Sequence, residues 1–268
     1  MPPASASVLT ALTRRTSGTI AHLTISRPAK LNALNSPLLT QLPQTLHSLT
    51  ANHADLLCII LTGAGSKSFI GGADIAEMAR LDSPGAARTF ISRVSGACRS
   101  IRECPVPVIA RVNGYALGAG LEVAVSCDFR VVCRGAVFGM PEVRVGIPSV
   151  VEAALLPGLI GWGRTRQLLM LGENITADEA LKWGLVEKVV EPEALDDAVE
   201  EWVCQLEKNG PLAVRRQKAL IQKWENPSLE RAIQAGVTAF EESFVSKEGE
   251  ITESARMLGA FLKDKSRI

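Results

Sequence analysis

Continuous apolar runs alternate with amphipathic segments over the first two-thirds of the chain. The apolar runs are four in number and each is bounded by polar or glycine-rich turns, which is typical of strands. They occupy residues 19–26, 56–63, 106–114 and 129–135. Helical patterning fills the intervals, at residues 36–51, 74–80, 85–103 and 120–128. Because these strands are apolar on both faces, the pattern predicts an α/β core with largely parallel strands.

After about Ser149 the pattern becomes one of helices joined by short turns. Thr176-Ala-Asp-Glu179 forms a capping box, and Gly184 ends the short helix that it opens. Further helices are expected at residues 193–208, 212–224, 228–245 and 250–264, separated by Asn-Gly-Pro and Asn-Pro breaks. We therefore divide the chain into an N-terminal extension with the first strand (1–17), an α/β core (18–195) and a C-terminal helical region (196–268).

Composition and charge narrow the classes of partner. Hydrophobic residues make up 47% and charged residues 21% of the 268 residues, as in an ordinary globular protein. The net charge is +1, so the chain has no long-range field to gather nucleic acid or an anionic membrane. The longest apolar run carries Glu152 in its middle and is too polar to span a bilayer. We expect neither a nucleic-acid nor a membrane partner.

Several common chemistries lack their motifs. The six cysteines form no CxxC pair, and the three histidines all lie in the first fifth of the chain, so no metal site is expected. The same distribution argues against Ser-His-Asp or Cys-His catalysis. There is no GxSxG or HExxH motif, no Walker A loop and no complete dinucleotide fingerprint. The cysteines are expected to be reduced thiols of the core.

Two glycine-rich turns each follow a strand and lead into a helix. The first is FIGGADIAEM, residues 69–78, and the second is NGYALGAGLE, residues 113–122. Glycine allows the backbone to turn sharply and leaves its N–H groups unshielded, and a helix N-terminus suits an anion. Two such turns facing each other could bind one developing oxyanion. Alternatively, they are tight structural turns and nothing more.

Two glutamates stand in apolar surroundings near these turns. Glu122 lies just inside the second helix, in ALGAGLEVAVS, and Glu142 lies in FGMPEVRVGIP. Burial raises the pKa of a carboxyl group toward the range useful for proton transfer, and two carboxyls in different environments can divide acid and base roles. Each glutamate could instead cap a helix or pair with a cation.

Together these segments resemble the enoyl-CoA hydratase/isomerase (crotonase) superfamily. The resemblance rests on FIGGADIAEM, ARVNGYALGAGLEVAVSCD and FGMPEVRVGIP in that order, supported by ISRPAKLNALN and LGENITADEALKWGLVEKVV, and it covers residues 18–265. It implies an α/β fold with a crotonase-like ββα spiral core and a C-terminal helical trimerisation region. It also implies homotrimers, often paired into hexamers, and an acyl-CoA substrate. Coenzyme A is then part of the substrate, and no separate cofactor is expected.

The resemblance also implies roles for individual residues. The backbone N–H groups of Ala73 and Ala119 would form an oxyanion hole. Glu122 would orient and deprotonate water, and Glu142 would supply a proton to the substrate Cα. Lys30 and a C-terminal lysine, Lys263 or Lys265, would meet the CoA phosphates, unless they are ordinary solvated lysines. The full set of expected substrate-binding residues is Ala29, Lys30, Leu31, Gly72, Asp74, Ile75, Gly118 and Lys263.

The sequence departs from the family pattern at two places. Ala76 stands where hydratases commonly carry a lysine, so one phosphate contact is absent. Ser149-Val-Val-Glu152 replaces the glycine-rich stretch that usually follows GIP. It reads either as a capping box that opens the next helix or as the site of a third carboxylate near the acyl pocket.

The presence of both glutamates favours a hydro-lyase of the enoyl-CoA hydratase type, which adds water across the 2,3 double bond of a 2-enoyl-CoA. The alternatives are a 3-enoyl-CoA/2-enoyl-CoA isomerase or another crotonase reaction on a specialised acyl-CoA. A non-catalytic scaffold or RNA-binding homologue is disfavoured by the intact glutamates and the near-neutral charge. Ser266-Arg267-Ile268 is a variant of the Ser-Lys-Leu address and predicts a peroxisomal location, with the cytoplasm or mitochondrion otherwise. Fatty acid metabolism is the expected context.

Overall fold

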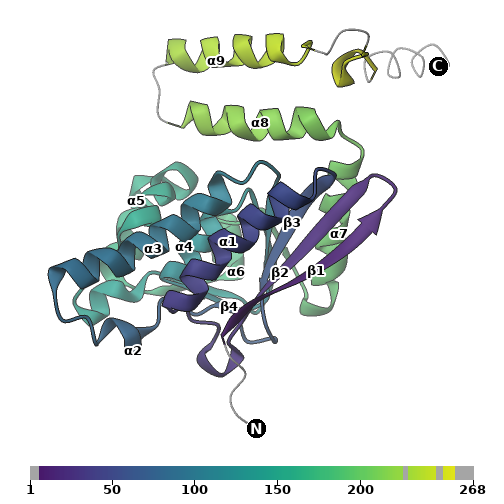
Figure 1. The fold of residues 1–268 in the computed structure, drawn as a ribbon. Coiled ribbons are helices and arrows are strands. Elements are labelled where there is room, and N and C mark those ends of the chain that lie inside the picture. The colour runs from purple at the N-terminus through teal and green to yellow at the C-terminus, as the bar shows by residue number, and fades with distance from the viewer. Residues whose placement is uncertain (1–5, 226–228, 246–249, 257–268) are drawn as a thin grey trace.

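A six-stranded sheet forms the centre of the protein (Figure 1), whose computed structural model describes residues 6–225, 229–245 and 250–256. The strand order is β1-β2-β3-β5-β7-β10, and every neighbouring pair is parallel except β1 with β2. The strands are β1 (Ser7–Arg15), β2 (Gly18–Ser26), β3 (Leu56–Gly63), β5 (Val108–Val112), β7 (Phe129–Cys133) and β10 (Lys188–Val190). The prediction of an α/β core with largely parallel strands is confirmed.

A second, four-stranded sheet explains how the glycine-rich turns come together. Its order is β4-β6-β8-β9, and β4, β6 and β8 each follow one long strand of the central sheet. The order strand, short strand, helix therefore repeats along the chain, as expected for a ββα spiral core. Because β4 pairs in parallel with β6, the turns that follow these two strands lie at the same edge. The short strands are β4 (Ser68–Ile70), β6 (Tyr115–Leu117), β8 (Val137–Gly139) and β9 (Asn174–Thr176).

Helices cover the sheets and enclose an apolar core. In the view of Figure 1, α1 lies in front of the central sheet and α7 behind it. The helix α4 is enclosed on all sides, and each of its eight residues is buried. Such a helix has no polar face, which is why its sequence, AGLEVAVS, is apolar all round except at its glutamate and its serine. The helices of this region are α1 (Ser36–Asn52), α2 (Ile75–Met78), α3 (Pro84–Arg102), α4 (Ala119–Ser126), α5 (Leu156–Leu171), α6 (Ala177–Trp183) and α7 (Leu195–Glu207).

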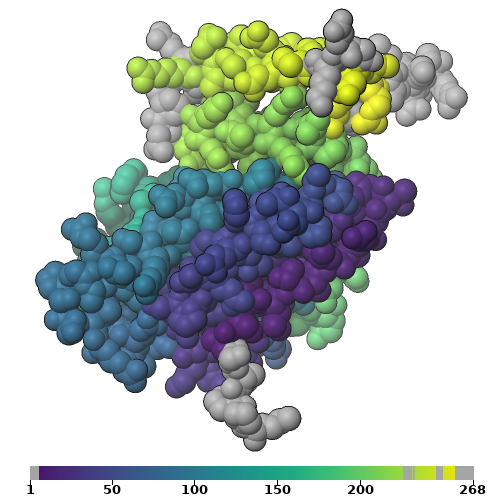
Figure 2. All heavy atoms as spheres, in the orientation of Figure 1, coloured from purple at the N-terminus to yellow at the C-terminus, as the bar shows by residue number. Residues whose placement is uncertain are grey.

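Two further helices form a layer on top of the core, as the space-filling view also shows (Figure 2). They are α8 (Pro211–Trp224) and α9 (Leu229–Glu242). The first strand and the helix before this layer belong to the core itself. The strand β1 pairs along its whole length with β2, and α7 packs its buried residues against the sheet. No helix within the described residues is long and apolar enough to cross a membrane.

The C-terminal third differs from the sequence expectation in two respects. It holds two short strands, β9 and β10, which complete the two sheets, whereas the pattern indicated only helices. The helix expected at residues 250–264 falls mostly outside the described residues. Short 3-10 helices connect the remaining elements, and one of them, η2, contributes to the site described below. They are η1 (Pro28–Lys30), η2 (Pro141–Val145), η3 (Val151–Leu155) and η4 (Pro192–Ala194).

Candidate active site

The first glycine-rich turn carries Ala73 on an extended stretch of backbone. The N–H of Leu34 donates to the Gly72 carbonyl, and the N–H of Asp74 donates to the Leu34 carbonyl, each at 2.8 Å. Successive N–H groups of an extended chain point to opposite sides, so the N–H of Ala73 faces away from Leu34. The pairing with Leu34 therefore leaves the N–H of Ala73 unused.

The second turn places Ala119 at the first position of α4. Gly118 precedes it with φ +50° and ψ −123°, a conformation that favours glycine, and no side chain caps the helix. The N–H of Gly118 donates to the Gly139 carbonyl at 2.9 Å, which ties the turn to β8. The N–H of Ala119 is one of the free donors that any helix N-terminus presents. It therefore suits an anion, as the sequence predicts.

The two turns are in contact. A Cβ atom added to Gly72 would lie 3.2 Å from the carbonyl oxygen of Leu117. Both turns line one cavity of about 670 Å³, together with Glu122 and Glu142. The structure therefore brings together the six residues predicted for this point: Gly72, Ala73, Gly118, Ala119, Glu122 and Glu142.

Glu122 is the buried member of the glutamate pair, with 4% of its surface exposed. Burial raises the pKa of its carboxyl to about 8, and the nearby charge of Glu142 adds to the increase. The backbone N–H of Ala153 donates to its Oε1 at 3.2 Å, which favours the ionised form and limits the rise. A carboxyl with a pKa near neutrality can take up a proton and release it again.

Glu142 lies on η2, where it is partly exposed and lines the same cavity. The hydroxyl of Ser149 donates to its Oε2 at 2.7 Å. Its Oε1 lies against Gly118, since a Cβ there would be 2.5 Å from that oxygen. The two glutamates therefore differ in environment, as an acid and a base in one site must.

An apolar surface completes the cavity. Residues spaced as on one helical face of α3 form one part of it, and residues at 145–150 form another. The apolar lining residues include Ile75, Met78, Leu81, Ala87, Phe90, Ile91, Val94, Val145, Ile147 and Val150. Such a surface accommodates an alkyl or alkenyl group.

Residues 149–153 do not form a capping box. The N-terminal cap of η3 is Val150, which makes no side-chain capping bond, while the Ser149 hydroxyl is bonded to Glu142. Glu152 instead accepts a hydrogen bond from Ser95 of α3. The capping-box interpretation of Ser149-Val-Val-Glu152 was wrong, because these two side chains have stronger partners in the tertiary structure than the local backbone.

The expected CoA-binding segment lies beside the first turn. Leu31 follows η1 with φ +51° and accepts a hydrogen bond from the N–H of Gly71 at 2.8 Å. Ala29, Lys30 and Leu31 are exposed, which leaves them accessible to a ligand that approaches the cavity from outside. Lys263 lies outside the described residues.

Asp74 and Ile75 have different surroundings. Asp74 caps α2 by accepting hydrogen bonds from the N–H groups of Ala76 and Glu77, and it pairs with Arg27 at 2.5 Å. Although burial acts to raise the pKa of Asp74, the bond and charge of Arg27 and the cap hold it below its ordinary value. Asp74 therefore fixes the turn, whereas Ile75 is exposed and lines the mouth of the cavity.

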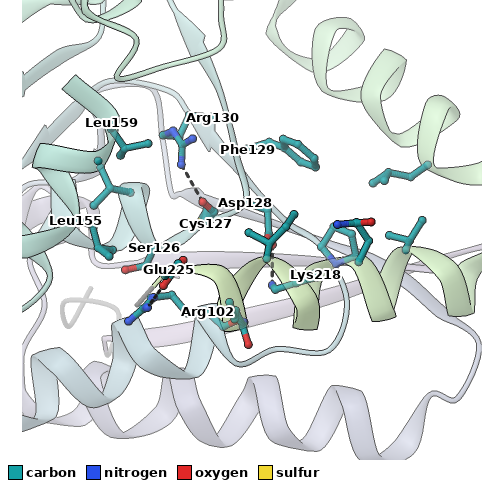
Figure 3. A pocket seen from close by; sticks show the side chains of 18 of the residues that line it. Arg102, Ser126, Cys127, Asp128, Phe129, Arg130, Leu155, Leu159, Lys218 and Glu225 are labelled. Atoms are coloured by element: carbon teal, nitrogen blue, oxygen red, sulfur yellow. Dashed lines mark hydrogen bonds and ion pairs between the residues drawn. The ribbon is translucent and has the colours of Figure 1, made fainter. Parts of the chain in front are cut away.

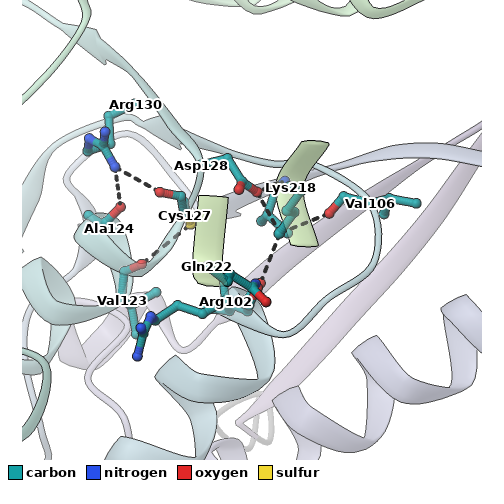
Figure 4. Close-up of polar contacts among 11 residues, drawn as sticks. Arg102, Val106, Val123, Ala124, Cys127, Asp128, Arg130, Lys218 and Gln222 are labelled. Atoms are coloured by element: carbon teal, nitrogen blue, oxygen red, sulfur yellow. Dashed lines mark hydrogen bonds and ion pairs between the residues drawn. The ribbon is translucent and has the colours of Figure 1, made fainter. Parts of the chain in front are cut away.

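A second, larger cavity of about 850 Å³ lies beneath α8 (Figure 3). Its central charged group, Lys218, is 7% exposed and donates to Asp128 at 2.6 Å and to the carbonyls of Val106 and Ile101 at 3.0 and 3.2 Å. Figure 4 shows this cluster beside Arg130, whose guanidinium donates to the Cys127 carbonyl at 2.8 Å. These contacts fasten α8 and the end of α4 to the sheet. The glycine-rich turns and the glutamates Glu122 and Glu142 line the smaller cavity, which is therefore the candidate active site.

Sequence reasoning missed the residues that hold the glutamates. Ser95 bonds to Glu152, Ser149 to Glu142 and Ala153 to Glu122. These contacts arise only in the tertiary structure, and no local sequence pattern identifies the three residues. The Asp74–Glu77 cap was detectable, because Asp-x-x-Glu before a helix is a capping signature. The wall on α3 was also detectable from its apolar spacing.

Comparisons with known proteins agree with this geometry. Residues 15–259 match the sequence profile described as enoyl-CoA hydratase/isomerase. The chain is 40% identical over 232 residues to the short-chain-enoyl-CoA hydratase of Clostridium acetobutylicum, covering 86% of this chain and 88% of that protein. It is 40% identical over 230 residues to the crotonyl-CoA hydratase of Syntrophomonas wolfei, covering 85% and 88%. The structure of enoyl-CoA hydratase from Bacillus anthracis superposes with a TM-score of 0.86 at 31% identity, covering 95% of this chain and 96% of that one.

Proposed function

The chain belongs to the enoyl-CoA hydratase/isomerase family, and we propose that it is a hydro-lyase that adds water across the 2,3 double bond of a 2-enoyl-CoA thioester. Relatives named for this reaction support the proposal. The observation that carries it is the presence of both Glu122 and Glu142 on the walls of one apolar cavity, beside two glycine-rich turns. An isomerase needs only one carboxylate to move a proton, so the pair favours hydration.

The residues divide the reaction between them. The thioester oxygen accepts hydrogen bonds from the N–H groups of Ala73 and Ala119, which stabilise the negative charge that develops on it. Glu122 takes a proton from a water molecule as the water oxygen bonds to Cβ. The resulting enolate takes a proton at Cα from Glu142, and the carbon–carbon double bond is thereby hydrated.

The substrate's coenzyme A lies along the exposed residues Ala29, Lys30 and Leu31 in this proposal. The hydrogen bond from Gly71 to Leu31 places this segment next to the oxyanion-binding turn, where the thioester joins the pantetheine arm. Lys30, together with Lys263 beyond the described residues, supplies positive charge for the CoA phosphates. The chemistry uses only groups of the protein and the substrate, with no separate cofactor.

The enzyme assembles as a homotrimer or a hexamer in this proposal. Its support is the set of large apolar side chains that α5, α8 and α9 leave exposed, since such surfaces mark contacts between subunits. They include Trp162, Met170, Ile221, Ile233, Val237 and Phe240. Light scattering coupled to size-exclusion chromatography measures the mass directly, and a monomer would contradict the assembly.

Ser266-Arg267-Ile268 supports a peroxisomal location and a role in fatty acid metabolism. A fluorescent protein fused to the N-terminus tests this, with a matched fusion that lacks the three residues. Peroxisomal signal from the first fusion alone is the expected result. Diffuse signal from both fusions would indicate a cytoplasmic enzyme. Mitochondrial signal would indicate a mitochondrial one.

Ultraviolet absorbance of the conjugated enoyl thioester tests the reaction. We expect absorbance to fall with crotonyl-CoA and a longer 2-enoyl-CoA, and Glu122→Gln and Glu142→Gln each to reduce kcat by about 10²- to 10⁴-fold. Glu193→Gln, at an exposed glutamate that does not line the cavity, should retain full activity. An increase in absorbance with a 3-enoyl-CoA, and no fall with the 2-enoyl-CoAs, would identify an isomerase instead.

A further inference from the structure

One short segment contacts both catalytic glutamates. The Ser149 hydroxyl donates to Oε2 of Glu142 at 2.7 Å, and the Ala153 N–H donates to Oε1 of Glu122 at 3.2 Å. The Ala153 N–H is shared, because it also donates to the Val150 carbonyl at 3.0 Å within η3. The orientation of both carboxyls therefore depends on where residues 149–153 lie.

This segment is attached to the core through Glu152. Its Oε1 accepts a hydrogen bond from the Ser95 hydroxyl of α3 at 3.2 Å. The residue is 7% exposed, and its Oε2 is buried without a hydrogen-bond partner among the described residues. A buried carboxyl that uses only part of its hydrogen-bonding capacity is costly, so a role is expected for it.

The backbone around Glu152 is also unusual. Val151 adopts φ +43°, in the left-handed region that a β-branched residue rarely enters. Glycine would adopt it without strain. Such strain persists only where the surrounding contacts determine the conformation. In this chain the contact that follows Val151 directly is the one from Glu152 to Ser95.

We propose that Glu152 is a positioning residue: its bond to Ser95 fixes residues 149–153, which in turn orient Glu122 and Glu142 for catalysis. The catalytic consequence rests on the proposed hydratase function. The structural claim, that the bond to Ser95 fixes residues 149–153, is independent of that function. Burial raises the pKa of Glu152, and its charge in turn contributes to raising the pKa of Glu122, which agrees with their proximity.

Steady-state kinetics test the catalytic consequence. Glu152→Ala should lower kcat about 10- to 100-fold and change KM less than about threefold, because misplaced carboxyls bind substrate normally but transfer protons poorly. Glu152→Gln keeps an oxygen for Ser95 and should retain kcat within about threefold of wild type. Ser95→Ala should lower kcat in the same manner as Glu152→Ala, whereas Ser92→Ala, at an exposed serine of the same helix, should have no effect.

The double variant separates positioning from two independent effects. Residues that act through one contact are non-additive, so Ser95→Ala combined with Glu152→Ala should be no slower than Glu152→Ala alone. If the kcat losses of the two single variants multiply in the double variant, or if Ser95→Ala has a wild-type kcat, the inference is overturned. If Glu152→Ala does not fold, Ser95→Ala with its kcat and KM decides alone.

A crystal structure of Glu152→Ala gives a readout that needs no activity. We expect the Ala153 nitrogen to be more than 3.5 Å from the Glu122 carboxyl, the limit of a hydrogen bond. An unchanged contact would overturn the inference, whatever the enzyme catalyses. A displaced segment in a protein whose wild type hydrates no 2-enoyl-CoA would support positioning and contradict the proposed function, so the two failures are distinguishable.

Discussion

The carboxylate of Glu142 lies against the backbone of Gly118, where an added Cβ atom would be 2.5 Å from Oε1. The proposed proton donor thus touches the residue that precedes Ala119, the proposed oxyanion donor. No side chain larger than hydrogen fits between them without displacing the carboxyl.

Gly118→Ala should therefore reduce activity strongly. The new methyl group pushes Glu142 away, and φ +50° adds backbone strain of about 1–3 kcal/mol. We expect kcat to fall about 100-fold and the Tm to fall by several degrees. Gly163→Ala on α5, where a Cβ meets no atom within 4 Å, is the matched control and should keep wild-type activity. A fully active Gly118→Ala enzyme would contradict the contact.

The raised pKa of Glu122 predicts how the rate depends on pH. The carboxyl must be ionised to take a proton from water, so the profile of kcat/KM should have a rising limb, about tenfold per pH unit, that ends near pH 8. Initial rates between pH 5 and 9 measure this. A rate that falls over the range from pH 6 to 8 would exclude Glu122 as the base.

The same pKa predicts how stability depends on pH. Between the ordinary value of 4.5 and about 8, the folded state holds a proton at Glu122 that the unfolded state has released. The free energy of unfolding contributed by this group is therefore full below pH 4.5 and decreases as the pH rises to about 8. Urea unfolding of wild type and Glu122→Gln should show that the variant lacks this decrease. Parallel pH curves for the two proteins would be inconsistent with the raised pKa.

Ser149→Ala tests the hydroxyl that holds Glu142. Without the 2.7 Å hydrogen bond the carboxyl samples other orientations, and we expect kcat to fall about 3- to 10-fold with little change in KM. Ser149→Thr keeps a hydroxyl and should retain most of the activity. Equal losses in both variants would indicate that the hydroxyl is not what positions Glu142.

Lys218→Met should affect folding and leave the chemistry intact. The substitution removes three hydrogen bonds that tie α8 to Asp128, Val106 and Ile101, and leaves Asp128 without its cation. We expect the free energy of unfolding to fall by about 3 kcal/mol. Lys223→Met, at an exposed position of the same helix, should change it by less than about 0.5 kcal/mol. Loss of kcat in folded Lys218→Met would contradict the assignment of the active site to the other cavity.

The long elements could be predicted from sequence because each is a continuous apolar run or an amphipathic segment of many residues. The strand at residues 56–63 and the helix at 85–103 are examples, and the structure has them at Leu56–Gly63 and Pro84–Arg102. The strands β4, β6, β8 and β9 have three residues each, too few to show a period. They form because strands distant in the sequence pair with them, and a short stretch of sequence does not reveal these pairing partners.

The same distinction applies to the site. The glycine-rich turns and the two glutamates could be predicted because strand, turn and helix start are adjacent in sequence. Ser95 and Glu152 are 57 residues apart, and their contact exists only because η3 packs against α3. The sequence offered two interpretations of Glu152, and only the tertiary packing distinguishes between them.

The complete burial of α4 also determines how the enzyme responds to ionic strength. Mobile ions screen charges in water over about 10 Å at 0.1 M salt, but they do not enter the core that surrounds this helix. In the proposed reaction, the partial positive charge at its first residue, Ala119, therefore acts on the enolate with the same strength in dilute buffer and in concentrated salt. Lys30 is exposed, so the attraction that we propose between it and the CoA phosphates is screened. Salt should thus weaken capture of the substrate and leave the turnover of bound substrate unchanged.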